Sequence, residues 1–167
     1  QGYAIERTKI LLSLLALSMG EDDEFSYNLW SANTLNFNFQ EKFRPYHGFD
    51  IIIGNPPYVC SRNLPQETKE IIKKWSVCST GHPDLYIPFF QVAIENLSSN
   101  GVMGYITMNS FLKSVNGRAL REYFNTLHKL IHIIDFRGRQ IFHSKNTYTC
   151  LFFAENKKSD YLYYGVY

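Results

Sequence analysis

The sequence lacks the residue patterns that mark several classes of protein. Only three cysteines occur among 167 residues, and no two are close along the chain, which argues against a disulfide framework or a zinc knuckle. No secretory signal is visible, and the apolar run over residues 10–19 is too short to span a bilayer. Because unpaired thiols are typical of a reducing compartment, we expect a cytoplasmic protein without a membrane segment.

The sequence also lacks an excess of either charge. Lys and Arg number 17 against 15 Asp and Glu, which leaves a net charge of +2. This balance neither indicates nor excludes nucleic-acid binding, because a local basic patch can act while the total stays near neutral. Aromatic residues are abundant, with 13 Phe, 12 Tyr and 2 Trp. Composition alone does not separate core packing from a site for stacking bases.

Strand-like and helix-like segments alternate through the middle of the chain. This alternation predicts an α/β fold with mostly parallel strands. The predicted helices cover residues 4–19, 66–75, 83–97 and 117–127. The predicted strands cover residues 27–31, 49–54, 102–108, 130–136, 147–155 and 161–167.

The most informative stretch is FDIIIGNPPYV, residues 49–59. Its continuous apolar run predicts a strand that is buried on both faces. Pro56 and Pro57 end the strand, because proline cannot donate a hydrogen bond to the ladder. The two prolines also restrict each other and Asn55, so the turn is stiff. Ligands of open parallel sheets bind beyond such strand ends, which makes this turn the candidate site.

The turn presents groups that suit a planar ring with an amino substituent. The Asn55 amide oxygen and the Pro56 carbonyl are two neighbouring hydrogen-bond acceptors, and Tyr58 adds a flat face for stacking. Two acceptors suit the two protons of an exocyclic amine such as the N6 group of adenine. The alternative is a rigid turn that only ends a strand. Because the Asn55–Tyr58 turn lies directly after an apolar strand, a binding site is favoured over this alternative.

The stretch resembles the amino-methyltransferase signature, in which Asp/Asn-Pro-Pro-Tyr/Phe follows the fourth strand of an S-adenosylmethionine-dependent fold. The whole chain is similar to the Eco57I-like adenine-N6 DNA methyltransferase module of type II (IIG-like) restriction-modification enzymes. The further matching segments are residues 84–89, 101–112, 133–142 and 147–153. The resemblance implies a Rossmann-like methyltransferase fold, S-adenosylmethionine as cofactor, and double-stranded DNA as partner, with the target base flipped out of the stack.

The resemblance also implies roles for single residues in the target-base pocket. Asn55, Pro56, Pro57 and Tyr58 match the catalytic turn, in which Asn55 and Pro56 would hold the adenine N6 and Tyr58 would stack on the flipped base. Phe142 matches the aromatic residue that packs on the other face of that base. We therefore expect Tyr58 and Phe142 to enclose the target base.

Cofactor and DNA contacts follow from the same resemblance. Phe89 matches an aromatic residue that lines the adenine of the cofactor, and Asn33 occupies a position at which the family commonly has an aspartate. Basic side chains near strand ends are expected to contact DNA phosphates. These residues are Lys113, Arg118, Arg137, Arg139 and Lys145.

Two cofactor elements of the family are missing: the glycine-rich loop after the first strand and the acidic residue that ends the second strand. We therefore expect residues 1–167 to be the C-terminal portion of a methyltransferase catalytic domain that lacks its first two strands. By itself this portion should bind S-adenosylmethionine weakly and methylate no DNA. The exposed edge of the strand at residues 49–54 could then pair with a second copy as a homodimer.

Other functions stay open from the sequence. The same tetrapeptide would serve a methyltransferase that acts on RNA adenine or protein glutamine, and a non-catalytic remnant could bind DNA or a partner subunit. His128 and His132 are four residues apart but lack a third ligand. The sequence therefore predicts no metal site.

Overall fold

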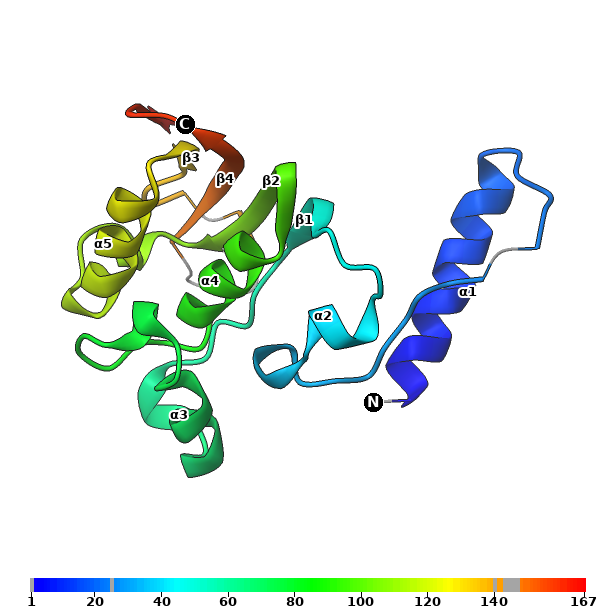
Figure 1. Ribbon diagram of the computed structural model, residues 1–167, viewed down its shortest axis with the longest axis horizontal. Helices are drawn as coiled ribbons and strands as arrows, with labels where there is room; N and C mark the ends of the chain where they lie inside the picture. Colours follow the sequence, from blue (N-terminus) through cyan, green and yellow to red (C-terminus); the bar gives the residue numbers. More distant parts are fainter. Residues whose placement is uncertain (1, 25, 140, 143–147) are drawn as a thin grey trace. The chain divides into compact units, whose positions relative to one another are not determined.

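The structure is a computed structural model (Figure 1) that describes residues 2–24, 26–139, 141–142 and 148–167. The chain divides into two compact units, Gln1–Phe37 and Asn38–Tyr167, each described here by itself. No described helix is both long enough and apolar enough to cross a bilayer.

The first unit contains one long helix, α1, which spans Gly2–Ser18 and confirms the predicted helix. Its leucine-rich sequence contains no interior glycine or proline, which favours helix formation. The strand predicted at residues 27–31 is wrong, because the structure places irregular chain there. The backbone amide of Leu29 donates instead to the nearby carbonyl of Tyr27, at 3.0 Å. The first unit has no described strand with which residues 27–31 could form β-sheet hydrogen bonds.

The second unit is built on a five-stranded sheet with the order β1-β2-β4-β3-β5. Two strand pairs are parallel, β1 with β2 and β3 with β5, whereas β4 runs antiparallel to both β2 and β3. The expectation of mostly parallel strands is therefore confirmed for β1, β2, β3 and β5, which all run in one direction. Of the described strands only β4 is reversed, because a parallel return needs a long crossover and no described helix lies between β3 and β4. The strands are β1 (Phe49–Gly54), β2 (Leu97–Met108), β3 (Lys129–Asp135), β4 (Thr149–Lys158) and β5 (Leu162–Val166).

Three helices of the second unit, α3, α4 and α5, confirm the predicted segments with shorter limits, whereas the short helix α2 was not predicted. Helix α4 begins at Ile87 rather than at residue 83, since Asp84 is engaged with the backbone of Ser61. A proline in its first turn is compatible with a helix start. The helices are α2 (Phe39–Lys42), α3 (Gln66–Ile72), α4 (Ile87–Glu95) and α5 (Arg118–Leu127).

One face of the sheet carries the core. Helices α4 and α5 lie together on this side (Figure 1), and aromatic rings fill the space beneath them. Phe152 of β4 lies 4.9 Å from Phe90 of α4 and 4.9 Å from Phe124 of α5, measured between ring centroids. Phe111 packs on Phe90 at 5.2 Å. These buried rings attach both helices to the sheet.

The opposite face is open over the edge strand β1. Ile51 is 72% exposed and Ile53 is 80% exposed, so the prediction that this strand is buried on both faces is wrong for this chain. Strand β1 lies at the end of the sheet, and within the second unit no described helix covers these two side chains. Phe153 and His132 continue the same face across the sheet, where His132 stacks on Tyr163 at 4.7 Å.

Candidate active site

The strand order brings several chain segments to one edge of the sheet. The parallel pairing of β1 with β2 places residues 55–58 and 109–112 beyond neighbouring strand ends. Strand β3 ends at the same edge, because Asp135 pairs with Cys150 near the start of the antiparallel strand β4. The candidate turn therefore lies at the carboxyl edge, where parallel sheets bind ligands.

The turn keeps two hydrogen-bond acceptors available. The Asn55 side chain is exposed and Pro56 is buried. Within the described residues, neither the side-chain amide of Asn55 nor the backbone carbonyl of Pro56 forms a hydrogen bond. The turn is nevertheless anchored, since the Pro57 carbonyl accepts from the amide of Val59 at 3.0 Å and the Val59 carbonyl accepts from Leu85 at 2.9 Å. The two acceptors therefore lie on a fixed backbone.

Tyr58 is fixed by its hydroxyl group, which donates to the carbonyl of Ile106 on β2 at 3.0 Å. Burial, together with the nearby Cys150, raises the pKa of Tyr58 to about 12. The hydroxyl is therefore neutral at physiological pH, and it cannot serve as a general base there. Because the bond to β2 orients the ring, Tyr58 can act as a packing surface beside the turn.

A pocket of about 590 Å³ lies at the same edge, between the ends of β2, β3, β4 and β5, and we call it the strand-end pocket. Lys113 and Arg137 both line it, so the structure brings together two of the predicted phosphate contacts. Both side chains are exposed. Tyr148 contributes an exposed ring to the same pocket.

The strand-end pocket contains a buried carboxylate that the sequence did not indicate. Asp135 accepts hydrogen bonds from the Asn109 amide at 2.7 Å, the Tyr164 hydroxyl at 2.6 Å and the Arg137 backbone amide at 2.9 Å. Burial alone would raise the pKa of Asp135, but these bonds and the charge of Arg137 lower it. Its position as the last residue of β3 is the sequence signal that could have revealed it.

The other predicted DNA contacts are more scattered. Arg118 is exposed at the first position of α5. The Arg139 guanidinium lies 5.3 Å from the centre of the Tyr167 ring. Lys145 lies outside the described residues, so its role stays a prediction. The structure thus places neither Arg118 nor Arg139 in the strand-end pocket.

The predicted second aromatic wall of the target pocket also stays a prediction. Phe142 is half-buried, and no ring contact with Tyr58 is found among the described residues. An aromatic ring can enclose a flipped base only if it faces the first ring across the space for that base.

The two predicted cofactor residues lie in different units. Phe89 is half-buried in α4, and its carbonyl accepts a hydrogen bond from the Tyr105 hydroxyl at 3.3 Å. The Asn33 side chain caps a short 3-10 helix by accepting from the Leu35 amide at 3.1 Å. No described strand is followed by a glycine-rich loop, so the residues present do not fit the methionine and ribose parts of S-adenosylmethionine.

The contacts of His128, His132 and the Cys150 thiol favour structural roles for these side chains. His128 pairs with Asp160 at 3.2 Å, whereas His132 stacks on Tyr163. No cluster of three His, Cys, Asp or Glu side chains suited to a metal occurs in the described parts of the chain. Burial, with a smaller contribution from Asp135, raises the pKa of the Cys150 thiol to about 12, which leaves this thiol uncharged and unreactive.

Comparisons with known proteins identify the family to which this chain is similar. The family profile of the Eco57I restriction-modification methylase matches residues 3–142. The type II restriction enzyme and methyltransferase RM.Eco57I of Escherichia coli is 34% identical over 115 residues, which are 67% of this chain and 12% of that protein. The type II methyltransferase M.BstVI of Geobacillus stearothermophilus is 29% identical over 134 residues, 80% of this chain and 24% of that protein.

Solved structures show the same fold. The type IIL restriction-modification enzyme MmeI, in complex with DNA, superposes with a TM-score of 0.64 at 16% identity over 90% of this chain and 22% of its own. A type I methyltransferase subunit from Streptococcus thermophilus superposes with a TM-score of 0.57 at 17% identity, over 81% of this chain and 29% of its own. The five-stranded mixed sheet is thus that of methyltransferase domains in restriction-modification enzymes.

Proposed function

Because the chain belongs to the Eco57I restriction-modification methylase family, we propose that it forms the target-base half of an S-adenosylmethionine-dependent enzyme that methylates adenine N6 in double-stranded DNA. The observation that carries this proposal is the Asn55–Tyr58 turn, which keeps two acceptors available beside an anchored ring at the carboxyl edge.

The residues of the turn would act on a base that has left the duplex stack, since the N6 atom cannot be reached inside it. The Asn55 side-chain oxygen and the Pro56 carbonyl would each accept a hydrogen bond from one N–H of the amine. These bonds hold the amine in place and direct its lone pair away from the turn, towards a methyl donor. Tyr58, which stays neutral, would pack against the ring. The cofactor supplies the methyl group when bound.

We further propose that residues 1–167 are the C-terminal portion of the catalytic domain. The chain covers 12% and 24% of the two relatives named above, and no described strand is followed by a glycine-rich loop. Contacts to the methionine and ribose of the cofactor would then come from sequence that this chain does not contain. On this view the chain alone holds the target base but does not transfer a methyl group.

The free edge of β1 carries a related proposal about partners. The edge has no strand beyond it in the sheet, and unpaired strand edges readily take another chain. We propose that two copies of the 167-residue chain pair through this edge as a homodimer. Sedimentation of the purified chain tests this, and a monomer at all concentrations would contradict it.

Methylation in cells tests the function. The complete protein that contains this chain is expressed in a bacterial host without adenine methylation of its own, and N6-methyladenine is measured in the genomic DNA by mass spectrometry. We expect Asn55→Ala to lower the methylation rate by roughly 100-fold or more, the loss seen when one well-placed catalytic hydrogen bond is removed. The matched control is Asn125→Ala, which removes an exposed asparagine of α5.

Several results would contradict the proposal. N6-methyladenine formation at the normal rate in Asn55→Ala would exclude the proposed role of the turn. Methyl label in RNA or in protein glutamine, with none in DNA, would assign another substrate. Calorimetric titration of the isolated chain with S-adenosylmethionine is expected to show no binding in the micromolar range, and tight binding there would refute the division of the site.

A further inference from the structure

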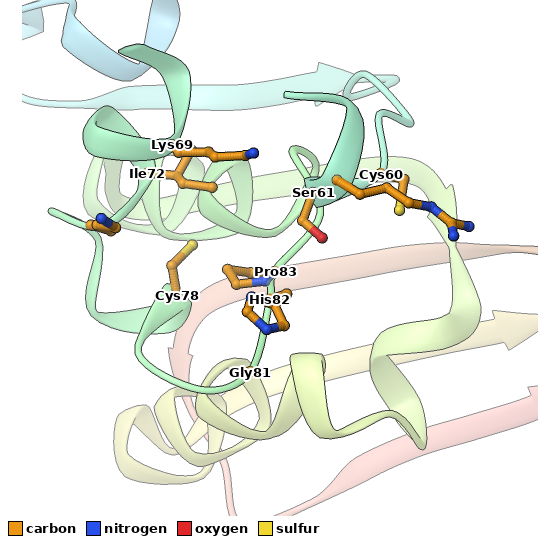
Figure 2. A pocket seen from close by; sticks show the side chains of 10 residues that line it. Cys60, Ser61, Lys69, Ile72, Cys78, Gly81, His82 and Pro83 are labelled. Atoms are coloured by element: carbon orange, nitrogen blue, oxygen red, sulfur yellow. The ribbon is translucent and has the colours of Figure 1, made fainter. Parts of the chain in front are cut away.

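A second pocket, of about 650 Å³, follows the candidate turn in the sequence. Its lining comes from three segments, residues 60–62, 69–73 and 78–83, and we call it the α3 pocket. Figure 2 shows Lys69 and Ile72 of α3 on one side of it and His82 with Pro83 on the other.

Only one sign of charge lines the α3 pocket. Arg62, Lys69, Lys73 and His82 are among its lining residues, and no carboxylate is. Lys73 is compensated by Glu70 at 2.8 Å, whereas within the described residues Arg62 and Lys69 have no ion pair. Lys69 is also half-buried. The pocket therefore offers two cationic side chains, Arg62 and Lys69, that no described carboxylate neutralises, and these would attract an anion.

Two walls of the α3 pocket are fixed by side chains outside it. The Ser61 amide donates to Asp84 at 2.9 Å, and the His82 amide donates to the Asn116 side chain at 2.9 Å. Gly81 has φ +64, a conformation that residues with a side chain rarely adopt, and a Cβ atom there would lie 2.3 Å from the Asn116 oxygen and displace this side chain. These bonds order the pocket before any ligand binds, which lowers the entropy cost of binding.

The α3 pocket lies close to the candidate turn along the chain. Cys60 lines the pocket and follows Tyr58 by two residues, a reach of about 7 Å at most. Successive nucleotides of a DNA strand rise about 3.4 Å each. A strand whose flipped base packs on Tyr58 would therefore have its neighbouring backbone within reach of the pocket.

From this charge, order and position we infer that the α3 pocket binds a backbone phosphate of the DNA strand that carries the flipped base. The inference rests on the proposed function and extends it. Lys69 and Arg62 supply the charge, and His82 faces Lys69 across the pocket (Figure 2). Such contacts fix the register of a DNA strand without reading its sequence.

The salt dependence of DNA binding tests the inference. Fluorescence anisotropy measures the affinity of the 167-residue chain for a labelled duplex over a series of KCl concentrations. We expect Lys69→Met to reduce the slope of log affinity against log salt by about 0.9, the value for one lost phosphate contact, and Lys69→Arg to keep the slope. The matched control is Lys74→Met, which removes an exposed lysine that does not line the pocket and should leave the slope unchanged.

The outcomes separate this inference from the proposed function. An unchanged slope in Lys69→Met, or an equal reduction in Lys74→Met, overturns the inference alone. Absence of duplex binding by the chain also overturns it, whereas the proposed function falls only if the complete protein makes no N6-methyladenine. Inorganic phosphate is the second probe: if it binds the pocket as tightly as the duplex does, by NMR shifts of the Ser61 and His82 amides, the assignment to a DNA strand is overturned.

Discussion

Phe152 and Phe153 are neighbours on β4, and they face opposite sides of the same sheet. Phe152 is completely buried among the rings of Phe90, Phe111 and Phe124. Phe153 is 36% exposed and lies on the open face with Ile53. The two side chains have the same chemistry and adjacent positions, so the difference comes only from what covers each face.

This contrast shows what an apolar pattern does and does not specify. The run Ile51–Ile53 looks like a strand with two buried faces, but burial needs a second layer of structure as well as an apolar side chain. Helices α4 and α5 supply that layer on one side. Within the second unit no described helix supplies it over Ile51 and Ile53, whose side chains are exposed.

The largest expected effect on stability comes from Phe152→Ala, and Phe153→Ala is the variant to compare with it. Phe152→Ala should lower the free energy of unfolding by about 3–5 kcal/mol, because it leaves a cavity among packed rings. Phe153→Ala should lower it by less than about 1 kcal/mol, because that side chain is partly in water already. Urea unfolding followed by circular dichroism measures both. Equal losses would show that the open face is packed in solution.

An intermediate effect is expected from Asp135, the buried carboxylate at the end of the covered face. Asp135→Asn should lower the free energy of unfolding at neutral pH by about 1–3 kcal/mol, since it weakens the charge-assisted bonds from Tyr164 and Asn109. Stability after each change is measured by thermal unfolding. Asn109→Ala removes one donor only and should cost less.

The pH dependence of Asp135 has a definite sign. Its pKa in the folded protein lies below the ordinary value of 3.8, so the contribution to stability is present above that value and is lost as the pH falls through the lower, folded pKa. Because Asp135→Asn has no carboxyl group to titrate at this position, its free energy of unfolding should fall less than that of the wild type as the pH is lowered. Identical acid unfolding curves for the wild type and Asp135→Asn would contradict the network.

The smallest effect on stability is expected at the open edge. Ile53→Lys should change the free energy of unfolding by less than about 0.5 kcal/mol, because the side chain is 80% exposed. The same change should abolish pairing through β1, since a lysine on an edge strand disfavours association. Sedimentation measures the association, and Ile10→Lys, on the exposed surface of α1, serves as control. Undiminished association in Ile53→Lys would place the contact elsewhere.

Much of the fold could be predicted because local rules decide it. Helix α1 follows from its leucine-rich sequence, and the end of β1 follows from two prolines that cannot extend a ladder. The direction of β4 could not be predicted, because strand direction depends on the connection that precedes it. The predicted strand at residues 27–31 fails for a related reason, as β-propensity has no effect without a partner strand.

The candidate site shows the same division. The sequence identified the turn at Asn55 and Tyr58, because a signature of adjacent residues carries it. It missed Asp135 and the α3 pocket, because their parts lie far apart along the chain: Asp135 is bonded by Asn109 and Tyr164, and His82 is held by Asn116. Only the folded chain brings such residues within hydrogen-bonding distance.

By itself the sequence determined the stiff turn, its order of acceptor and ring residues, and its place after an apolar strand, since proline geometry and apolar runs are local properties. The tertiary structure alone decided which face of that strand is covered, where Tyr58 anchors its hydroxyl, and that Lys113 and Arg137 share a pocket with Asp135. These outcomes depend on sheet order and on the layers packed against it, which no single segment of the chain encodes.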